Sequence, residues 1–184
     1  MIYNSKFKIQ NSKFTGYTLL EIIVVVSILG VILAVITPNM LGRTRRASLE
    51  SSLSGLAGDM KKARAEAMSF GIRTVLLTVN SGTSGPKDLN QDGREEEHYI
   101  CFIDNDRNGT FTLNVDQVLY QKNWGNVEVV TNTLSPIIFL PQGTIVPNGQ
   151  APRALNIKFP HYDSEYSLEL LSILGMTRIV RIRL

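Results

Sequence analysis

Two short acidic stretches carry the residue pattern of a calcium-binding loop. In each, oxygen-bearing side chains alternate and a glycine follows them: Asp88, Asn90, Asp92 and Gly93 in the first stretch, and Asp104, Asp106, Asn108 and Gly109 in the second. Alternate oxygen ligands can converge on a hard cation, and the glycine permits the sharp turn that such a loop needs. A structural Ca²⁺ ion is therefore the one candidate cofactor that the sequence indicates.

Neither stretch completes an EF-hand. That motif places a bidentate glutamate at its twelfth position, where this chain has Tyr99 and Val115. Asp, Asn and Gly also favour tight turns without any ion. A third interpretation is a docking surface for a basic partner, formed by the glutamates at 95–97. The segment 87–116 holds eight acidic residues against three basic ones, and all three interpretations stay open.

The chain contains no set of residues that is typical of catalysis. Its two histidines, His98 and His161, are far apart and lack metal-ligand spacing. No phosphate-binding loop, dinucleotide fingerprint or nucleophile elbow occurs in the sequence. The single cysteine, Cys101, excludes an intrachain disulfide, and its apolar neighbours indicate a buried thiol. We therefore predict that the protein is not an enzyme.

An apolar run dominates the N-terminal part of the chain. No charged side chain occurs between Ile22 and Gly42, a stretch of roughly 20 residues that could cross ~30 Å of hydrocarbon as a helix. Glu21 stands at the head of this run. A carboxylate in hydrocarbon costs about 2.5–3.5 kcal/mol, so it requires a partner. The run ends without the small-residue cleavage site of a secretory signal, and we predict a helix that spans the membrane.

A second helical pattern follows Pro38 and Gly42, which we expect to interrupt the helix. Seven apolar residues then recur at alternating spacings of four and three: Leu49, Leu53, Leu56, Met60, Ala63, Ala67 and Phe70. This spacing predicts one apolar stripe that packs on a sheet. The opposite face carries Lys61, Lys62 and Arg64, which we expect to be solvated or to contact another subunit. Gly71 is expected to end the helix.

Beyond Gly71 the pattern changes to strand-like runs separated by turn residues. The runs are Ile72–Val79, His98–Ile103, Val118–Lys122, Val127–Asn132, Ile137–Leu140, Leu155–Phe159, Tyr166–Ile173 and Thr177–Leu184. The sequence therefore predicts an α+β fold, in which a long N-terminal α-helix packs on a C-terminal antiparallel β-sheet domain.

The hexapeptide Gly16-Tyr17-Thr18-Leu19-Leu20-Glu21, followed by the apolar run, resembles the leader of type IV pilins and pseudopilins. In that family a membrane peptidase cuts after the glycine and methylates the new N-terminal amine. The resemblance implies cleavage after Gly16 and methylation of Tyr17, where the family usually has phenylalanine. It also implies that Glu21 pairs with the terminal amine of a neighbouring subunit and sets the register of a fibre. Pairing of Glu21 within its own subunit is the alternative, because Tyr17 is four residues away.

Motifs in the rest of the chain resemble the GspH/FimT group of minor pseudopilins and minor pilins. In chain order they are Ala63–Met68, Phe102–Gly109 with Asp116–Leu119, Ile138–Gly143 and Leu174–Arg178. The resemblance implies a pilin-like form of the α+β fold. It divides the chain into a leader peptide at 1–16, a transmembrane and fibre-core half of the helix at 17–42, an amphipathic half at 43–71 and a globular β domain at 72–184.

The resemblance also implies a location and partners. We expect a minor pseudopilin of a type II secretion pseudopilus, with a single span in the bacterial inner membrane and its globular domain in the periplasm. The expected partners are other pilins or pseudopilins in a fibre, the prepilin peptidase and the inner-membrane assembly platform.

Two alternatives remain. A FimT-like minor pilin would prime assembly of a type IV pilus, with a role in DNA uptake through a basic face formed by Arg178, Arg181 and Arg183. Met176, however, replaces the first arginine of the family's DNA-associated motif. Removal of the leader with its three lysines also takes the formal charge from +3 to zero, so DNA is not an expected partner. The second alternative is an uncleaved, monomeric, membrane-anchored Ca²⁺-binding module.

Overall fold

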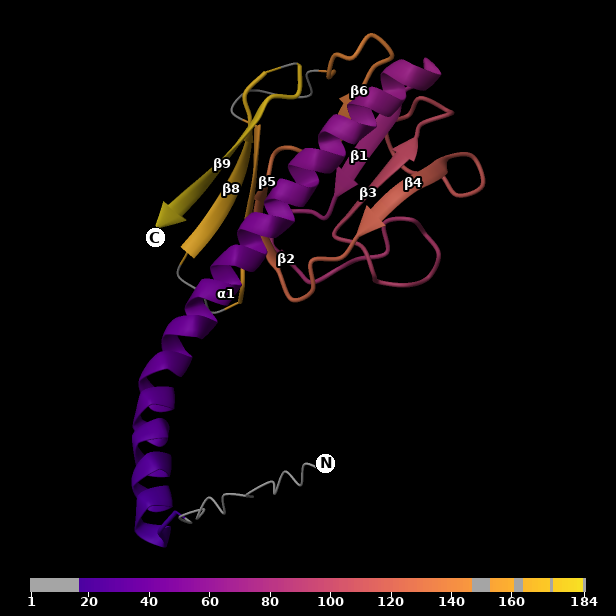
Figure 1. Ribbon diagram of the computed structural model, residues 1–184. Coiled ribbons are helices and arrows are strands. Elements are labelled where there is room, and N and C mark those ends of the chain that lie inside the picture. The colour runs from indigo at the N-terminus through magenta and orange to yellow at the C-terminus, as the bar shows by residue number, and fades with distance from the viewer. Residues whose placement is uncertain (1–16, 147–152, 161–163, 173, 184) are drawn as a thin grey trace, which may run out of the picture. The chain divides into compact units, whose positions relative to one another are not determined.

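The structure is a computed structural model that describes residues 17–146, 153–160, 164–172 and 174–183. In these residues one helix, α1, precedes the strands β1 to β9, which Figure 1 labels in chain order. The chain forms two compact units, Met1–Arg43 and Thr44–Leu184.

The helix α1, Leu19–Phe70, remains helical at Pro38 and Gly42, so the interruption expected at these residues is wrong. Proline lacks the N–H group for one helical hydrogen bond, but its φ is fixed near the helical value, which is compatible with a continuous helix. Within the described part of the chain, no helix combines the length and the apolar character needed to cross a membrane. The transmembrane assignment of residues 17–42 stays a prediction.

In the unit Thr44–Leu184, the apolar stripe of α1 is buried almost as predicted. Six of its members have at most 1% of their surface exposed: Leu49, Leu53, Leu56, Met60, Ala63 and Ala67. The seventh, Phe70, is 66% exposed, so its predicted place in the core is wrong. Gly71 follows at a φ of 65°, and the amide of Ile72 donates to the carbonyl of Ala67 at 3.2 Å. This C-cap turns the chain before Phe70 can reach the sheets.

Two antiparallel sheets follow the helix, with the strand orders β4-β3-β1-β6 and β2-β5-β7-β8-β9. The strands are β1 Thr74–Thr78, β2 Thr83–Ser84, β3 Tyr99–Ile103, β4 Gln117–Lys122, β5 Glu128–Asn132, β6 Ile137–Phe139, β7 Arg153–Lys158, β8 Ser164–Leu170 and β9 Thr177–Arg183. All eight predicted strands are present, and the α+β class is confirmed. The sequence does not predict β2, because two residues are too few to show an alternation.

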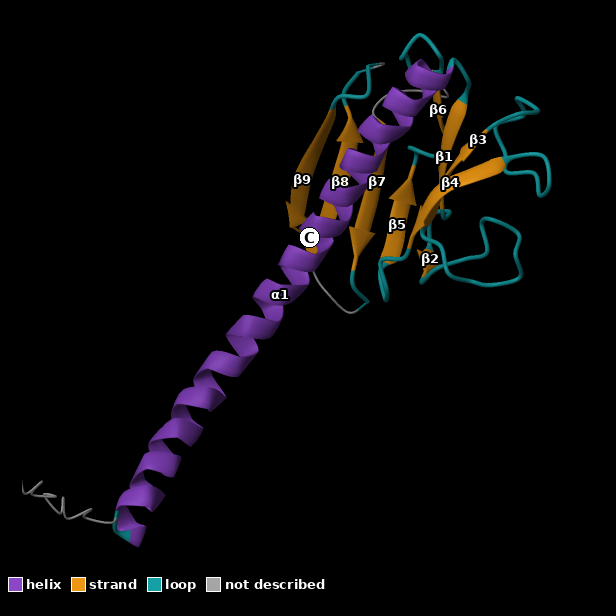
Figure 2. Ribbon diagram, turned by 45° about the vertical axis from the view of Figure 1, so that its right-hand side comes forward, coloured by secondary structure: helices purple, strands orange, loops and turns teal. Residues whose placement is uncertain are grey.

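The helix and both sheets enclose one main core in this unit. The buried stripe of α1 shares a cluster with Leu76 and Phe139 of the first sheet and with Leu155 and Leu168 of the second. Figure 2 shows the C-terminal half of α1 lying across the strands of both sheets. One apolar stripe therefore joins the two sheets into a single domain.

The other face of the first sheet is covered by loops. Phe111 joins a second buried cluster with Val75, Ile100, Phe102 and Ile138. Its ring meets that of Phe102 edge to face, with 5.4 Å between their centres. Leu89 packs against the same cluster. Each acidic stretch therefore contains or adjoins an apolar residue that fixes it to the sheet.

Polar contacts fix the position of α1 on the sheets. Asp59 accepts hydrogen bonds from the hydroxyls of Tyr99 and Tyr120, each at 2.6 Å, through its carboxylate and its backbone carbonyl respectively. Lys62 lies over the Tyr120 ring, 4.7 Å from its centre. Arg64 donates to a carbonyl of the turn between β8 and β9 at 2.7 Å. Lys61 and Lys62 are exposed, as expected of a solvated face, although Lys62 also contacts Tyr120. Arg64 is partly buried and contacts this subunit's own β domain.

Candidate functional site

Thr18 fixes the start of α1. The helix begins at Leu19, and the hydroxyl oxygen of Thr18 accepts a hydrogen bond from the amide of Glu21 at 3.2 Å. Thr18 is therefore the N-cap and Glu21 the third helical residue, which is the spacing of a capping box. The Thr-x-x-Glu pattern in the sequence is typical of a capping box. Glu21 therefore belongs to the helix cap, in addition to its predicted pairing with an amine.

The predicted processing and assembly residues lie at this helix start. Gly16 lies outside the described residues, and Tyr17 is 76% exposed. Among the described residues, no side chain forms a hydrogen bond or ion pair with the Glu21 carboxylate. A negative charge in the first turn suits the helix dipole, but in this part of the chain it has no cationic partner.

A continuous apolar surface follows Glu21. Its large side chains are each 46–77% exposed: Leu19, Leu20, Ile22, Ile23, Val24, Val25, Val26, Ile28, Leu29, Val31, Ile32 and Leu33. Monomeric soluble proteins rarely expose contiguous apolar patches larger than a few hundred Å². An exposed apolar surface of this kind is typical of a site that contacts another protein or a membrane.

The two acidic stretches fold into turns of the same backbone form. In both, the fourth residue has a φ of 60°, and the glycine in sixth place has a φ of 88° or 78°. The first aspartate of each turn accepts a hydrogen bond from that glycine, Asp88 from Gly93 at 3.0 Å and Asp104 from Gly109 at 3.2 Å. These left-handed conformations explain the glycines at these positions, because glycine adopts positive φ without steric cost.

The second turn brings three carboxylates together. One carboxylate oxygen from each of Asp104, Asp106 and Asp116 lies within 4.8 Å of the other two. The sequence predicts Asn108 as the third ligand, but its amide oxygen accepts a backbone hydrogen bond two residues further on at 2.6 Å. Asp116 was not predicted, because it is distant in sequence and reaches the turn only when the loop folds back. There it accepts the amide hydrogen of Asn105 at 2.8 Å.

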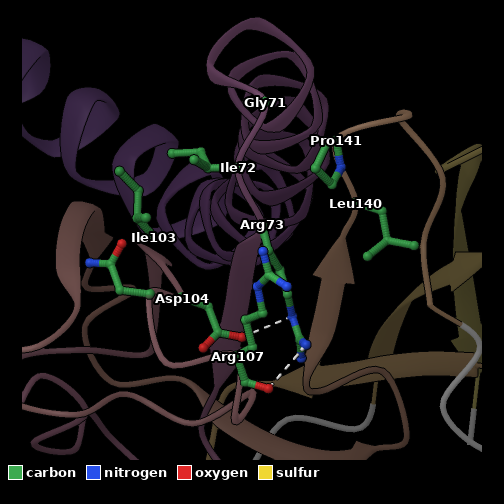
Figure 3. A pocket seen from close by; sticks show the side chains of 9 residues that line it. Gly71, Ile72, Arg73, Ile103, Asp104, Arg107, Leu140 and Pro141 are labelled. Atoms are coloured by element: carbon green, nitrogen blue, oxygen red, sulfur yellow. Dashed lines mark hydrogen bonds and ion pairs between the residues drawn. The ribbon is translucent and has the colours of Figure 1, made fainter.

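Asp104 is the buried member of this group. Its side chain is fully buried, and its Oδ2 atom forms an ion pair with Nε of Arg73 at 2.8 Å. Burial raises the pKa of Asp104 above its ordinary value, and the neighbouring Asp106 and Asp116 add to this against the opposing effect of Arg73. Figure 3 shows one oxygen of Asp104 turned toward Arg73 and the other turned away from it. Arg73 also donates to the carbonyl of Arg107 at 3.1 Å.

The first turn is closed by a buried glutamate. Glu97 is fully buried, and its Oε2 atom accepts the amide hydrogen of Leu89 at 3.0 Å. Burial raises its pKa, and the two aspartates of the turn contribute to the shift. The docking surface expected at 95–97 is therefore wrong for Glu97, and only Glu95 and Glu96 are exposed.

The C-terminal arginines are largely engaged within the β domain. Arg178 donates to one oxygen of Glu169 at 2.6 and 3.1 Å, and Arg181 donates to the hydroxyl of Ser164 at 3.1 Å. The side chain of Arg183 lies outside the described ones. A guanidinium that is paired with a carboxylate has less charge to offer a phosphate, so the basic face is weaker than its three arginines suggest.

The remaining candidate residues for chemistry are buried. Cys101 is fully buried, and burial raises the pKa of its thiol to about 12, so the reactive thiolate does not form near neutral pH. His98 is also fully buried. Its Nδ1 atom accepts the amide hydrogen of Trp124 at 3.1 Å, and its Nε2 atom lies 3.3 Å from the carbonyl of Val127. One nitrogen accepts while the other donates, so the imidazole is neutral. His161 lies outside the described residues.

We expect the free energy of unfolding to fall as the pH drops below about 6.5, and His98→Gln to remove part of this fall. Burial lowers the pKa of folded His98 below 6.5. The unfolded chain therefore takes up the proton first, and stability decreases below that pH by up to about 1.4 kcal/mol per unit until the folded pKa is reached. Urea unfolding of the full chain in non-ionic micelles measures both slopes. Identical slopes for the two proteins would contradict this prediction.

Two family models match separate, non-overlapping parts of the chain. A model described as type II transport protein GspH matches residues 53–165, more than half of the chain. A model described as the prokaryotic N-terminal methylation motif matches residues 11–37, a range that includes Gly16, Tyr17 and Glu21. No curated protein and no solved structure gives a significant match.

Proposed function

The chain belongs to the GspH family of pilin-like pseudopilins, and from this membership we propose that it is a minor pseudopilin of a type II secretion pseudopilus. The observation that carries the proposal is the coexistence of the methylation motif and the GspH domain in one chain. The family is one of structural subunits, so the proposed activity is assembly and not catalysis.

The proposed processing removes residues 1–16. The prepilin peptidase cuts the peptide bond after Gly16 and methylates the amine that is freed on Tyr17. This amine is a cation at the end of an apolar helix, and Glu21 is an anion four residues further along. Each is costly in an apolar surrounding, so a pair of opposite charges is favoured over either charge alone.

We propose that Glu21 pairs with the amine of a neighbouring subunit. The exposed apolar side chains between Leu19 and Leu33 supply the surface for helix packing in the fibre core. Dispersion contacts between apolar helices tolerate several registers, whereas a charge pair fixes one of them. The β domain at 72–184 would then face outward, toward other subunits or the secreted substrate.

The proposed location is the bacterial inner membrane, with the β domain in the periplasm. Residues 17–42 would hold the subunit there until the inner-membrane assembly platform transfers it to a fibre with other pseudopilins. Assembly of a type IV pilus uses the same leader chemistry. We favour type II secretion because the model that matches the globular domain carries that description.

Intact-mass spectrometry of the full chain, expressed with and without a prepilin peptidase, tests the proposal. We expect the peptidase to remove the mass of residues 1–16 and to add one methyl group to Tyr17. Gly16→Val is the control, because a branched side chain beside the scissile bond should block the cut. An unchanged mass of the wild-type chain beside an active peptidase would support an uncleaved membrane-anchored module instead.

A further inference from the structure

The loop between β3 and β4 holds a buried carboxylate oxygen without a partner. Asp104 is 3% exposed and its side chain is fully buried. Its Oδ2 atom is used by Arg73 and Gly109, but its Oδ1 atom has no hydrogen-bond partner among the described residues. Leaving a buried acceptor unsatisfied costs about 1–3 kcal/mol, and more for a charged group.

Two further carboxylates lie beside Asp104, and neither can donate a hydrogen bond to its Oδ1 atom when it is ionised. Asp106 and Asp116 each place an oxygen within 4.8 Å of an Asp104 oxygen and of each other. An ionised carboxylate only accepts hydrogen bonds. Asp106 and Asp116 accept hydrogen bonds from neighbouring donors of the loop, so among the described residues it is the Oδ1 atom of Asp104 that lacks a proton or a cation.

From this geometry we propose that Asp104, Asp106 and Asp116 bind one Ca²⁺ ion. Calcium–oxygen distances are about 2.3–2.6 Å, so two ligands on opposite sides of the ion are ~4.6–5.2 Å apart. The spacing of the three oxygens lies within this limit. The ion would supply the positive charge that the buried Oδ1 atom of Asp104 lacks.

The charges of the site favour a divalent ion. Arg73 offsets one of the three carboxylates through its ion pair with Asp104. Two negative charges remain, which one divalent cation balances. All three side chains supply oxygen, and Asp106 is exposed while Asp116 is partly exposed. Oxygen ligands suit Ca²⁺ better than zinc, which prefers nitrogen and sulfur, and Ca²⁺ is less demanding than Mg²⁺, which requires near-ideal octahedral geometry.

The first turn provides a matched comparison. It has the same backbone form, but its sequence is Asp-x-Asn-x-Asp-Gly, whereas the second turn has Asp-x-Asp-x-Asn-Gly. Among the described residues, however, its acidic side chains do not form a group of three converging oxygens. An asparagine donates to an aspartate in both turns, Asn90 to Asp92 at 3.1 Å and Asn108 to Asp106 at 2.7 Å, so the difference between the turns is the convergence of three carboxylates in the second. We therefore place the ion in the second turn only.

Titration of the full chain with CaCl₂ tests this site. The protein, in non-ionic micelles, is first freed of divalent ions with a chelator, and binding is followed by calorimetry and by thermal unfolding. We expect one ion per chain with a Kd of about 10⁻⁴–10⁻³ M, the range of extracellular calcium modules. Calcium at roughly ten times the Kd should raise the Tm by about 3–6 °C, and Mg²⁺ should have no comparable effect.

Two aspartate-to-asparagine variants locate the ion. Asp106→Asn should weaken calcium binding at least ~10-fold while the chain still folds, because Asp106 is exposed and asparagine keeps an acceptor. Asp116→Asn should weaken binding as well, and it retains the oxygen that caps Asn105. Asp92→Asn makes the same chemical change at an exposed aspartate of the first turn, and this variant should bind calcium like the wild type.

The outcomes are distinct. Wild-type protein that shows neither heat of binding nor a Tm shift at about 10 mM CaCl₂ would overturn the proposal. Loss of binding in Asp92→Asn with retention in Asp106→Asn would also overturn it, because the ion would then lie in the first turn. Cleavage of the leader affects none of these measurements, so the result is independent of the proposed role in a fibre.

Discussion

The Glu21→Gln variant is expected to lose its leader normally but to enter fibres at least about tenfold less than the wild type. Glutamine at the third helical position still supports a capping box, so the start of α1 should be kept. The substitution removes only the negative charge. The methylated amine of the neighbouring subunit would then be a lone cation among apolar helices, and leaving one partner of a buried charge pair alone costs about 2–5 kcal/mol. Sheared or crosslinked fibres, separated from the membrane pool and quantified by immunoblot, measure the incorporation.

Thr18→Ala is the matched control for this prediction. It removes the hydroxyl that accepts the Glu21 amide at 3.2 Å, but it keeps the carboxylate. Loss of an N-cap costs about 1 kcal/mol, so we expect a smaller loss of incorporation than for Glu21→Gln. If Thr18→Ala impaired assembly as much as Glu21→Gln, the cap would be the main contribution of this segment. If both variants assembled like the wild type, the proposed charge pair would be wrong.

The sequence predicts those parts of the fold that depend on local periodicity. The spacing of four and three from Leu49 to Ala67 places six buried residues on one face of α1, because every member of a helical stripe meets the same neighbour. Alternation likewise locates the eight longer strands. The prediction is wrong at Phe70, where the C-cap turns the chain, and at Pro38, whose backbone tolerates the helix.

The candidate sites depend on contacts between residues far apart in sequence, and here the sequence is less informative. The pattern of the second turn identifies Asp104 and Asp106, but Asp116 joins them only because Phe111 anchors the loop on the sheet and folds it back. The burial of Glu97 also depends on how the loop folds. Its place in a run of three glutamates predicts an exposed charge instead. Strand order and the division into two sheets are also set by packing of distant segments, which no local pattern encodes.

The Leu53→Ala variant is expected to lower the free energy of unfolding of the β domain by about 2–5 kcal/mol. Leu53 is fully buried in the cluster that α1 forms with both sheets. The substitution removes apolar surface and leaves a cavity between layers that backbone hydrogen bonds hold in place, so the site cannot collapse fully. Urea unfolding of the full chain in non-ionic micelles, followed by the fluorescence of Trp124, measures the change. Trp124 packs against this cluster and is the chain's only tryptophan.

Ser54→Ala separates packing from helix propensity in this experiment. Ser54 is the next residue of α1, it is exposed, and alanine is the better helix former at both positions. We expect its free energy of unfolding to lie within about 0.5 kcal/mol of the wild type. A similar small change for Leu53→Ala would show that the stripe does not hold α1 on the sheets. A large loss for Leu53→Ala alone would mean that burial of the apolar stripe, and not helix propensity, holds the C-terminal half of α1 on the sheets.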